Sequence, residues 1–473
     1  MRVTSNTKAI VKLKKKYSKW PWETNLNGFK NWLLQIIPAF MLLWLLRKIL
    51  IKSEYRLKRE SIKFFELCNR AYAANKIRIT DRFLVVALEL VGLDFSNDYV
   101  VLLRNAVAST ITDPKSRREQ AECVLLATRE LEVLFFDATG WYQLSRGLFC
   151  LGYFRAAWVA RENSLDLSIA EGLTSSSSST ASGRAIEAYL ERLEFDSVRK
   201  LLAENLVLEK KASDTFRESL RWFEGNVSVI SAEDTCSDGG SVQIFHELVY
   251  GKKVVLVGPC SAYGEHGDEI DSADTVARIK YPGRDYLLDE RFFGKRCDIS
   301  QYPSLESLRE IAKISSHEYF DDLQLIVTGE ADSRAVRNTP VYSENQESPI
   351  YRTTVTTGLR LLISLVRQRP STLKIFGYSF YLEIEPYNTG MRSFYENSAW
   401  KFGQGHFLFG KSIDYPKVEI TSSFGAHDPV SNFCFAQNLY KAGLFDIEPY
   451  GKSILELTPY QYVERLEEML GDW

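Results

Sequence analysis

Apolar and polar residues follow two different patterns along this chain of 473 residues. Over residues 61–222 the apolar positions recur at three- and four-residue steps, which is the period of an amphipathic helix. Pro114, Gly140, Gly172 and a serine tract at 175–179 interrupt the pattern, and the tract has the composition of a linker between helices. We therefore predict an all-α region here.

A weak internal repeat lies inside this helical region. Six residues are matched 42 positions later by residues of similar kind. The first set is Leu148, Leu151, Tyr153, Val159, Glu162 and Asn163, and the second is Leu190, Leu193, Phe195, Leu201, Glu204 and Asn205. Helical pairs at such spacing are typical of tetratricopeptide-like solenoids, although two units are fewer than the roughly three that a stable solenoid needs. An ordinary helical bundle explains the pattern equally well, and either structure would serve as a spacer or as a platform for a protein partner.

The pattern changes after Gly225. Residues 253–258 (KVVLVG) form a short, continuous apolar run that ends at glycine, as a buried central strand does. Further elements are expected as helices at 356–368 and 460–470 and as strands at 372–377 and 418–421. Strands that alternate with helices predict a mostly parallel, Rossmann-like α/β sheet, in which ligands bind at the carboxyl ends of the strands.

Basic residues flank an uncharged segment near the N-terminus. Six lysines lie between residues 8 and 19, residues 32–46 carry no charge, and six further lysines or arginines lie between residues 47 and 59. A spanning helix needs about 20 apolar residues, so this uncharged segment is short. A signal-anchor, an interfacial helix on anionic lipid and a buried helix are all consistent with it, and the basic flanks favour membrane contact. No small-residue cleavage site follows, so we expect the segment to be retained.

Length, composition and charge limit the class of protein. A chain of this length is expected to hold two or three domains, which we place at residues 1–60, 61–225 and 226–473. The net charge of −2 gives no overall field that would attract nucleic acid. None of the seven cysteines forms a C-x-x-C pair or a Cys/His cluster of zinc-ligand spacing. We therefore expect neither a nucleic-acid partner nor a structural metal nor a disulfide framework.

Small residues follow the first predicted strand. Gly258 begins a loop that includes Ser261, and such a loop lets backbone amides approach a phosphate. Asp271 and Asp274 lie further along and could hold ribose hydroxyls. Most loops of this kind bind nothing, and the two aspartates could equally cap the following turn.

Two further stretches place polar groups where chemistry is expected. Thr356, Thr357 and Gly358 open a predicted helix, whose free amides and dipole would attract an anion, although a plain threonine N-cap has the same sequence. His427 follows the strand expected at 418–421, and a histidine there is a candidate general base for a sugar hydroxyl. Any single histidine is more often structural than catalytic.

The order and spacing of these stretches resemble the sialyltransferases of glycosyltransferase family 29. The sequences VVLVG (254–258) and GDEIDSADTVARIKYP (267–282) look like the large sialyl motif. TTGLRLLISLVRQ (356–368) with LKIFGYSF (373–380) resembles the small motif. SFYE (393–396) occupies the place of the third motif, and AHDPVSNF (426–433) resembles the very small motif. The resemblance covers the C-terminal half of the chain.

The resemblance implies a metal-independent, GT-A-like variant fold that transfers an acidic sugar from a CMP-activated donor with inversion. CMP-sialic acid would be the donor, or else CMP-Kdo or another CMP-linked nonulosonic acid, and the acceptor would be a glycan or glycolipid. His427 would be the general base. The residues implied for donor binding, including two that stabilise the large motif, are Gly258, Ser261, Asp271, Arg278, Thr356, Thr357, Gly358 and Tyr395. No cofactor is implied, and the α/β half has only a relaxed form of the metal-binding Asp-x-Asp pattern, at residues 446–448.

Several positions depart from the family pattern. Pro259 replaces an asparagine and removes a backbone donor, and Lys280 replaces another asparagine. Ser393 stands at the histidine of the third motif, and Asn432 stands at the glutamate of the last motif. These changes leave two alternatives open: an inactive scaffold that acts through its helical region, and an enzyme with another nucleotide sugar and another base.

The cysteines bear on the cellular location. Animal sialyltransferases join the large and small motifs by a disulfide, and the corresponding positions, near Val254 and Ser371, hold no cysteine. A reducing compartment is therefore allowed. Two membrane locations are consistent with this: the cytoplasmic face of a bacterial inner membrane, which the basic flank favours, and the Golgi membrane.

Overall fold

The computed structural model describes residues 114–131, 133, 136–150, 152–174, 179–204, 210–225, 239–260, 264–281, 283, 290–302, 323–329, 339–343, 353, 355–383 and 427–471. The basic N-terminal segment, the first part of the predicted helical region and the strand expected at 418–421 lie outside these residues. Among the helices in the described ranges, none has the length and apolar character needed to cross a membrane.

The described part of the predicted all-α region is helical, as expected. Its helices are α7 (Pro114–Glu130), α8 (Ala138–Cys150), α9 (Phe154–Thr174), α10 (Ser179–Glu191), α11 (Phe195–Glu204) and α12 (Lys210–Phe223). The helix break predicted at Gly140 is wrong, because this glycine lies in the first turn of α8. Its amide donates a hydrogen bond to the side chain of Asp137.

Two helical hairpins underlie the weak internal repeat. Helices α8 and α9 meet at a turn where Gly152 has a φ of 79°, and α10 and α11 meet at a turn where Leu193 has a φ of 61°. At both turns the residue that follows Gly152 or Leu193 donates its backbone N–H to the carbonyl five residues before it. This is the hydrogen bond of a Schellman motif. Equivalent turn residues are 41 positions apart (193 minus 152). The 42-residue register of the predicted repeat is therefore wrong by one residue, although both hairpins exist.

Seven parallel strands form one sheet in the order β5-β4-β3-β2-β1-β6-β7. They are β1 (Lys253–Val257), β2 (Thr275–Ile279), β3 (Ile299–Tyr302), β4 (Leu325–Thr328), β5 (Val341–Ser343), β6 (Thr372–Phe376) and β7 (Asp446–Ile447). The strands predicted at 253–258 and 372–377 are confirmed as β1 and β6. Strands β2 to β5 follow on one side of β1 and strands β6 and β7 on the other, so the strand order reverses between β1 and β6. In open α/β sheets such a reversal opens a crevice at the carboxyl ends of the strands, which is where ligands bind.

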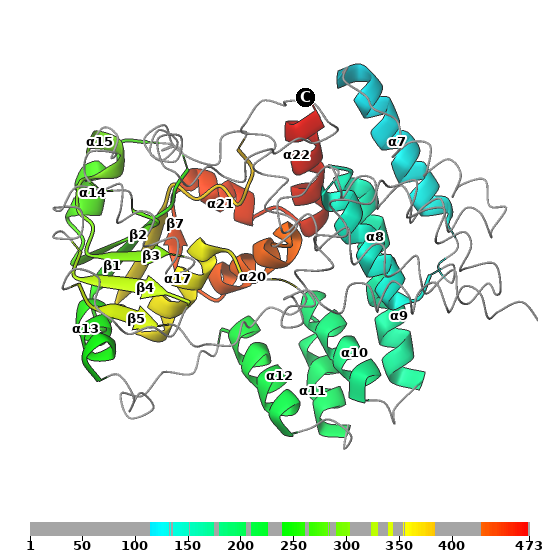
Figure 1. Cartoon of the computed structure of the whole chain (residues 1–473), viewed down its shortest axis with the longest axis horizontal. Helices are drawn as coiled ribbons and strands as arrows, with labels where there is room; N and C mark the ends of the chain where they lie inside the picture. The colour runs from blue at the N-terminus through cyan, green and yellow to red at the C-terminus, as the bar shows by residue number, and fades with distance from the viewer. Residues whose placement is uncertain are drawn as a thin grey trace, which may run out of the picture. The chain divides into compact units, whose positions relative to one another are not determined.

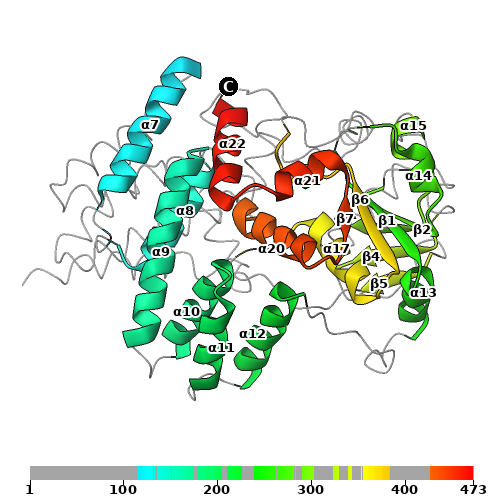
Figure 2. The same ribbon diagram turned by 180° about the vertical axis from the view of Figure 1, so that it is seen from behind.

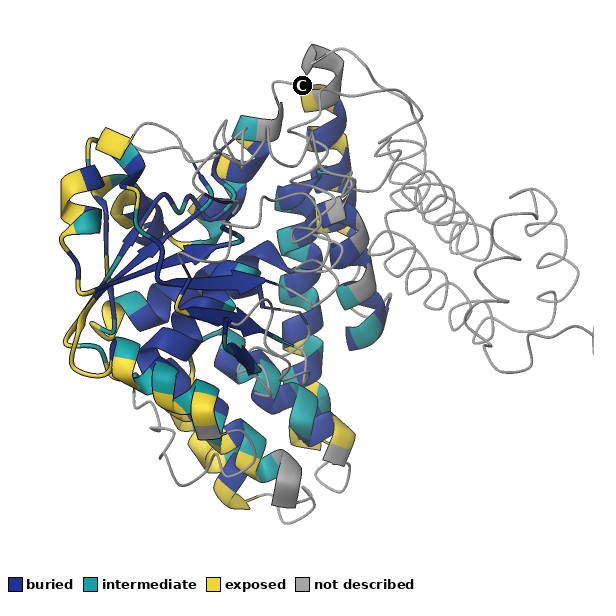
Figure 3. Ribbon diagram, turned by 60° about the vertical axis from the view of Figure 1, so that its left-hand side comes forward, coloured by how far each residue is buried: buried dark blue, intermediate teal, exposed yellow. Residues whose placement is uncertain are grey.

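Helices cover the sheet and explain why its central strands are continuously apolar. The helices of this half are α13 (Gly239–Val249), α14 (Gly267–Asp271), α15 (Glu290–Phe293), α17 (Thr357–Arg367), α20 (Pro429–Lys441), α21 (Pro449–Leu455) and α22 (Pro459–Gly471), and the last of them packs on α9 and α20 rather than on the sheet. The predicted helices at 356–368 and 460–470 are confirmed as α17 and α22. Four of the five residues of β1 and all five of β2 are buried, and Figure 3 shows the strands as the buried interior.

The two faces of the sheet pack against different helices. On one face, Val257 and Phe376 pack with Ile270 of α14 and Phe293 of α15. Ile279 points to the opposite face, because side chains alternate along a strand, and α17 contacts the sheet there.

Helix α20 lies between the sheet and the helical region in both views (Figures 1 and 2). Every residue of α20 from Pro429 to Leu439 is buried. Its Phe435 contacts the rings of Trp222 and Phe223 of α12, with centroids 6.2 and 5.2 Å apart. The helical region and the α/β half therefore share one core around α20.

Candidate functional site

The carboxyl ends of β1 and β6 come into close contact at the point where the strand order reverses. The amide of Gly258 donates to the carbonyl of Phe376 at 2.7 Å, and the amide of Cys260 donates to the carbonyl of Gly377 at 3.1 Å. A Cβ atom on Gly258 would lie 2.1 Å from the carbonyl oxygen of Gly377. Only glycine allows these two strands to approach so closely, which explains the glycine that ends the first predicted strand.

We expect Gly258→Ala to lower the free energy of unfolding by about 1–3 kcal/mol, because the added methyl group meets backbone rather than a movable side chain. Urea unfolding followed by circular dichroism measures this change. Gly240→Ala provides the matched control, since a Cβ at Gly240 has no atom within 4 Å. Equal free energies of unfolding for the two variants would show that β1 and β6 can move apart without loss of stability.

The start of α17 lies beside the same carboxyl ends of the strands. Thr356 is the N-cap of α17, and its hydroxyl accepts the amide of Leu359 at 3.4 Å. The same hydroxyl lies 3.1 Å from the hydroxyl of Tyr378, which follows β6. A Cβ on Gly358 would lie 2.4 Å from the ring of Tyr378. The structure therefore brings the predicted helix start and the first glycine loop together, with Tyr378 between them.

Tyr378 was not identified from the sequence. It occupies the second position after β6, next to Gly377, whose φ of 63° turns the chain sharply. Burial raises the pKa of Tyr378 to about 12, so its hydroxyl stays protonated and can donate a hydrogen bond at neutral pH. The aromatic-glycine ending of this strand was visible in the sequence, but the contact with Thr356 required the fold.

The start of α20 is joined directly to the start of α17. The side-chain oxygen of Asn432 accepts the backbone N–H of Thr356 at 3.0 Å, and its amide nitrogen donates to the carbonyl of Asp428 at 2.8 Å. Asp428 caps α20, and its own backbone amide donates to the hydroxyl oxygen of Thr353 at 2.6 Å. His427, partly exposed, precedes this cap. Asn432, which departs from the family pattern, thus connects the two helix starts on which the predicted site lies.

Two arginines from the helical region lie close to the carboxylate that caps α20. Arg161 of α9 forms an ion pair with Asp428, and both side chains are buried, at 1% and 0% exposed. Arg146 of α8 lies 3.7 Å from the same carboxylate. Burial alone would raise the pKa of Asp428, but the two arginines outweigh it and hold this pKa below its usual value. Two side chains of the helical region therefore hold the turn next to His427.

Other predicted residues lie apart from this group. The Asp271 carboxylate accepts the backbone amides of Lys295 and Arg296 at 3.0 and 2.9 Å. The buried Arg278 guanidinium donates to the carbonyls of Phe293 and Arg296 at 2.6 and 2.8 Å. Both side chains thus stabilise the connection from α15 to β3 and not the contact between β1 and β6. Two further predicted residues, Ser261 and Tyr395, lie outside the described residues.

A second histidine lies at the carboxyl edge and was given no role from the sequence. The ring of His266 lies 4.8 Å from the ring of Phe376 at the end of β6. Its Nε2 is 4.0 Å from Oε2 of Glu448, and its Nδ1 is 3.6 Å from Oε2 of Glu269. Glu448 is buried, which raises its pKa, and its other oxygen accepts the amide of Gly377 at 2.5 Å. His266 therefore lies between two carboxylates, of which that of Glu448 is buried.

The relaxed acidic pattern at 446–448 does not form a pair of ligands. Asp446 is exposed and accepts the amide of Ile447, whereas the buried Glu448 accepts the amide of Gly377. Within the described part of the chain, no group of three His, Cys, Asp or Glu side chains could hold a metal ion.

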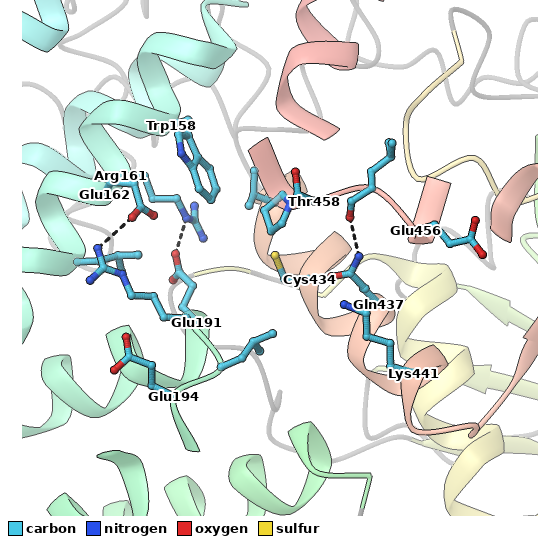
Figure 4. Close-up of a pocket in the computed structure, with 16 residues that line it drawn as sticks. Trp158, Arg161, Glu162, Glu191, Glu194, Cys434, Gln437, Lys441, Glu456 and Thr458 are labelled. Carbon is cyan, nitrogen blue, oxygen red and sulfur yellow. Dashed lines mark hydrogen bonds and ion pairs between the residues drawn. The ribbon is translucent and has the colours of Figure 1, made fainter. Parts of the chain in front are cut away.

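A groove of about 500 Å³ lies between the helical region and α20 (Figure 4). Its walls come from α9, the α10–α11 turn, α20 and the α21–α22 turn. Figure 4 shows Trp158 and Arg161 on one wall and Cys434 and Gln437 on the other. Burial raises the pKa of Cys434 to about 12, so its thiol is not a ready nucleophile. The lining of this groove, which consists of described residues, includes none of the predicted site residues.

No model of a known protein family, no curated protein and no solved structure matches this chain. The candidate site therefore rests on its geometry: a glycine loop, the start of α17 and the turn that carries His427 come together where the strand order of the sheet reverses.

Proposed function

We propose that this protein is a glycosyltransferase that transfers sialic acid or a related acidic sugar from a CMP-activated donor to a glycan acceptor. One observation carries the proposal. Three stretches far apart in the sequence, around Gly258, Thr356 and His427, meet at the carboxyl edge of a parallel sheet where the strand order reverses. Parallel α/β sheets bind their ligands at this position.

Each stretch supplies one part of the chemistry. The glycine loop lets backbone approach the donor, and the positive end of the α17 dipole favours the nucleotide phosphate. Because the amide of Thr356 is bonded to Asn432, the phosphate would meet the next amides, those of Thr357 and Gly358. His427 would take the proton from the acceptor hydroxyl as the sugar leaves CMP.

The first test is a thermal-shift titration of the full chain with CMP, UDP and GDP. A ligand that binds only the folded state stabilises it by about 2.7 kcal/mol at 100 times its dissociation constant. We expect CMP to raise the melting temperature and UDP and GDP to leave it unchanged. Stabilisation by UDP or GDP instead would point to another sugar donor on the same fold. The absence of any shift would support the alternative of an inactive scaffold that acts through its helical region.

A further inference from the structure

A buried charge cluster joins the helical region to the turn that carries His427. The guanidinium of Arg161 binds three groups: the carboxylate of Asp428, the carboxylate of Glu191 and the hydroxyl of Ser431, the last at 2.6 Å. Arg161 comes from the middle of α9, and Asp428 and Ser431 come from the start of α20. The cluster therefore connects one helical hairpin to the first turn of the central helix.

The Asp428 carboxylate has two functions at once. Its Oδ1 accepts the amides of Val430 and Ser431 at 3.0 and 3.2 Å and so caps α20, while its Oδ2 receives Arg161. Without a cation, a carboxylate that is 0% exposed would be costly to keep ionised. The orientation and the charge of the capping carboxylate thus depend on Arg161, more than 260 positions earlier in the chain.

We propose that Arg161 is a positioning residue that fixes the first turn of α20, and with it His427, relative to the α17 start. This inference rests on the proposed function. In this role Arg161 acts through Asp428, whose backbone carbonyl accepts the side-chain amide of Asn432, and the side-chain oxygen of Asn432 accepts the amide of Thr356. A planar guanidinium suits this position because its donors reach three partners in fixed directions, which a lysine ammonium cannot reproduce.

The helix itself offers a matched control. Arg155 lies on the same helix, α9, and its Nε lies 2.6 Å from the carboxylate of Glu467 on α22. Arg155→Met therefore removes another arginine that joins the helical region to the α/β half, without touching Asp428. The test compares Arg161→Met, Arg161→Lys and Arg155→Met in the full chain.

We expect Arg161→Met to reduce sugar transfer per folded molecule by about 100-fold, the loss that a misplacement of about 1 Å can cause, with CMP affinity retained. Arg161→Lys should restore only part of the rate, and Arg155→Met should leave both quantities unchanged. An equal loss of transfer rate in Arg155→Met would show that the rate depends on the docking of the two halves and not on Arg161 in particular. A normal transfer rate in Arg161→Met would also overturn the proposal.

Two additions keep the test decisive. If Arg161→Met fails to fold, the double variant Arg161→Met/Asp428→Asn also removes the buried charge that Arg161 had paired, while asparagine still caps α20. Its transfer rate should remain reduced, and a normal rate would overturn the proposal.

The NMR signal of the His427 Cε1–H group, assigned through His427→Gln, gives a readout that needs no substrate. Its chemical shift should change in Arg161→Met and stay the same in Arg155→Met. An unchanged chemical shift in both variants would refute the positioning role. If the wild type binds no CMP, the proposed function fails, while this NMR comparison still decides the inference.

Discussion

His427→Ala is expected to lower the rate of sugar transfer by about 10²–10⁴-fold, the usual contribution of general acid–base catalysis, while CMP binding stays intact. His427 is partly exposed and lies immediately before the cap of α20. The turn that carries it is bonded through Asn432 to Thr356, the N-cap of α17, where the nucleotide phosphate is proposed to lie. The proposed base and the proposed phosphate site therefore lie on helix starts that hydrogen bonds through Asn432 join.

The measurement needs a donor and a control histidine. After an acceptor has been found by screening glycans with CMP-sialic acid, release of CMP is followed for the wild type, His427→Ala and His246→Ala. His246 is a matched control, because its Nδ1 lies 3.2 Å from Oε1 of Gln368, at the far end of α17 from Thr356. A rate for His427→Ala equal to that of His246→Ala would remove His427 from the role of base.

Several central elements of the α/β half could be predicted because their sequences are strongly patterned. KVVLV and TLKIF are short apolar runs, and α17 has a capping threonine and a wide apolar face, so sequence alone located β1, β6 and α17. Helix α20 was not predicted, since it is buried on all sides and shows no amphipathic period. Strand β2 was read only as part of a motif, because it includes the charged Arg278, which is buried by bonding to backbone carbonyls.

The candidate site was predicted in part. Local sequence indicated Gly258, Thr356 and His427, because glycine after a strand, threonine at a helix start and histidine in a loop each have a chemical reason. Tyr378 and Arg161 were missed, since each matters through a partner distant in sequence. Asp271 and Arg278 share a motif with the glycine loop, but the parallel crossover carries them to the connection before β3.

Asp428→Ala is expected to destabilise the protein by about 3–5 kcal/mol at neutral pH, because it leaves Arg161 as a buried cation without its main partner. About 1 kcal/mol more comes from loss of the α20 cap. Asp428→Asn separates the two effects, since asparagine can still cap the helix but carries no charge. Asp446→Ala is the matched control: that aspartate is exposed and bonds only the adjacent amide, so little change is expected. Urea unfolding of the three variants measures these differences.

The pH dependence of the same variants tests the electrostatic explanation. Burial acts to raise the pKa of Asp428, but Arg161 and Arg146 outweigh it, so the folded pKa lies below the unfolded value of about 3.9. A depressed folded pKa means that the ion pair contributes its full stability above about pH 4 and loses it as the pH falls through the folded pKa. The gap in unfolding free energy between wild type and Asp428→Asn should therefore be constant from pH 7 to pH 5 and narrow below pH 4. A gap that stays the same at pH 3 would mean that packing and capping, rather than the charge of Asp428, hold α20 against the helical region.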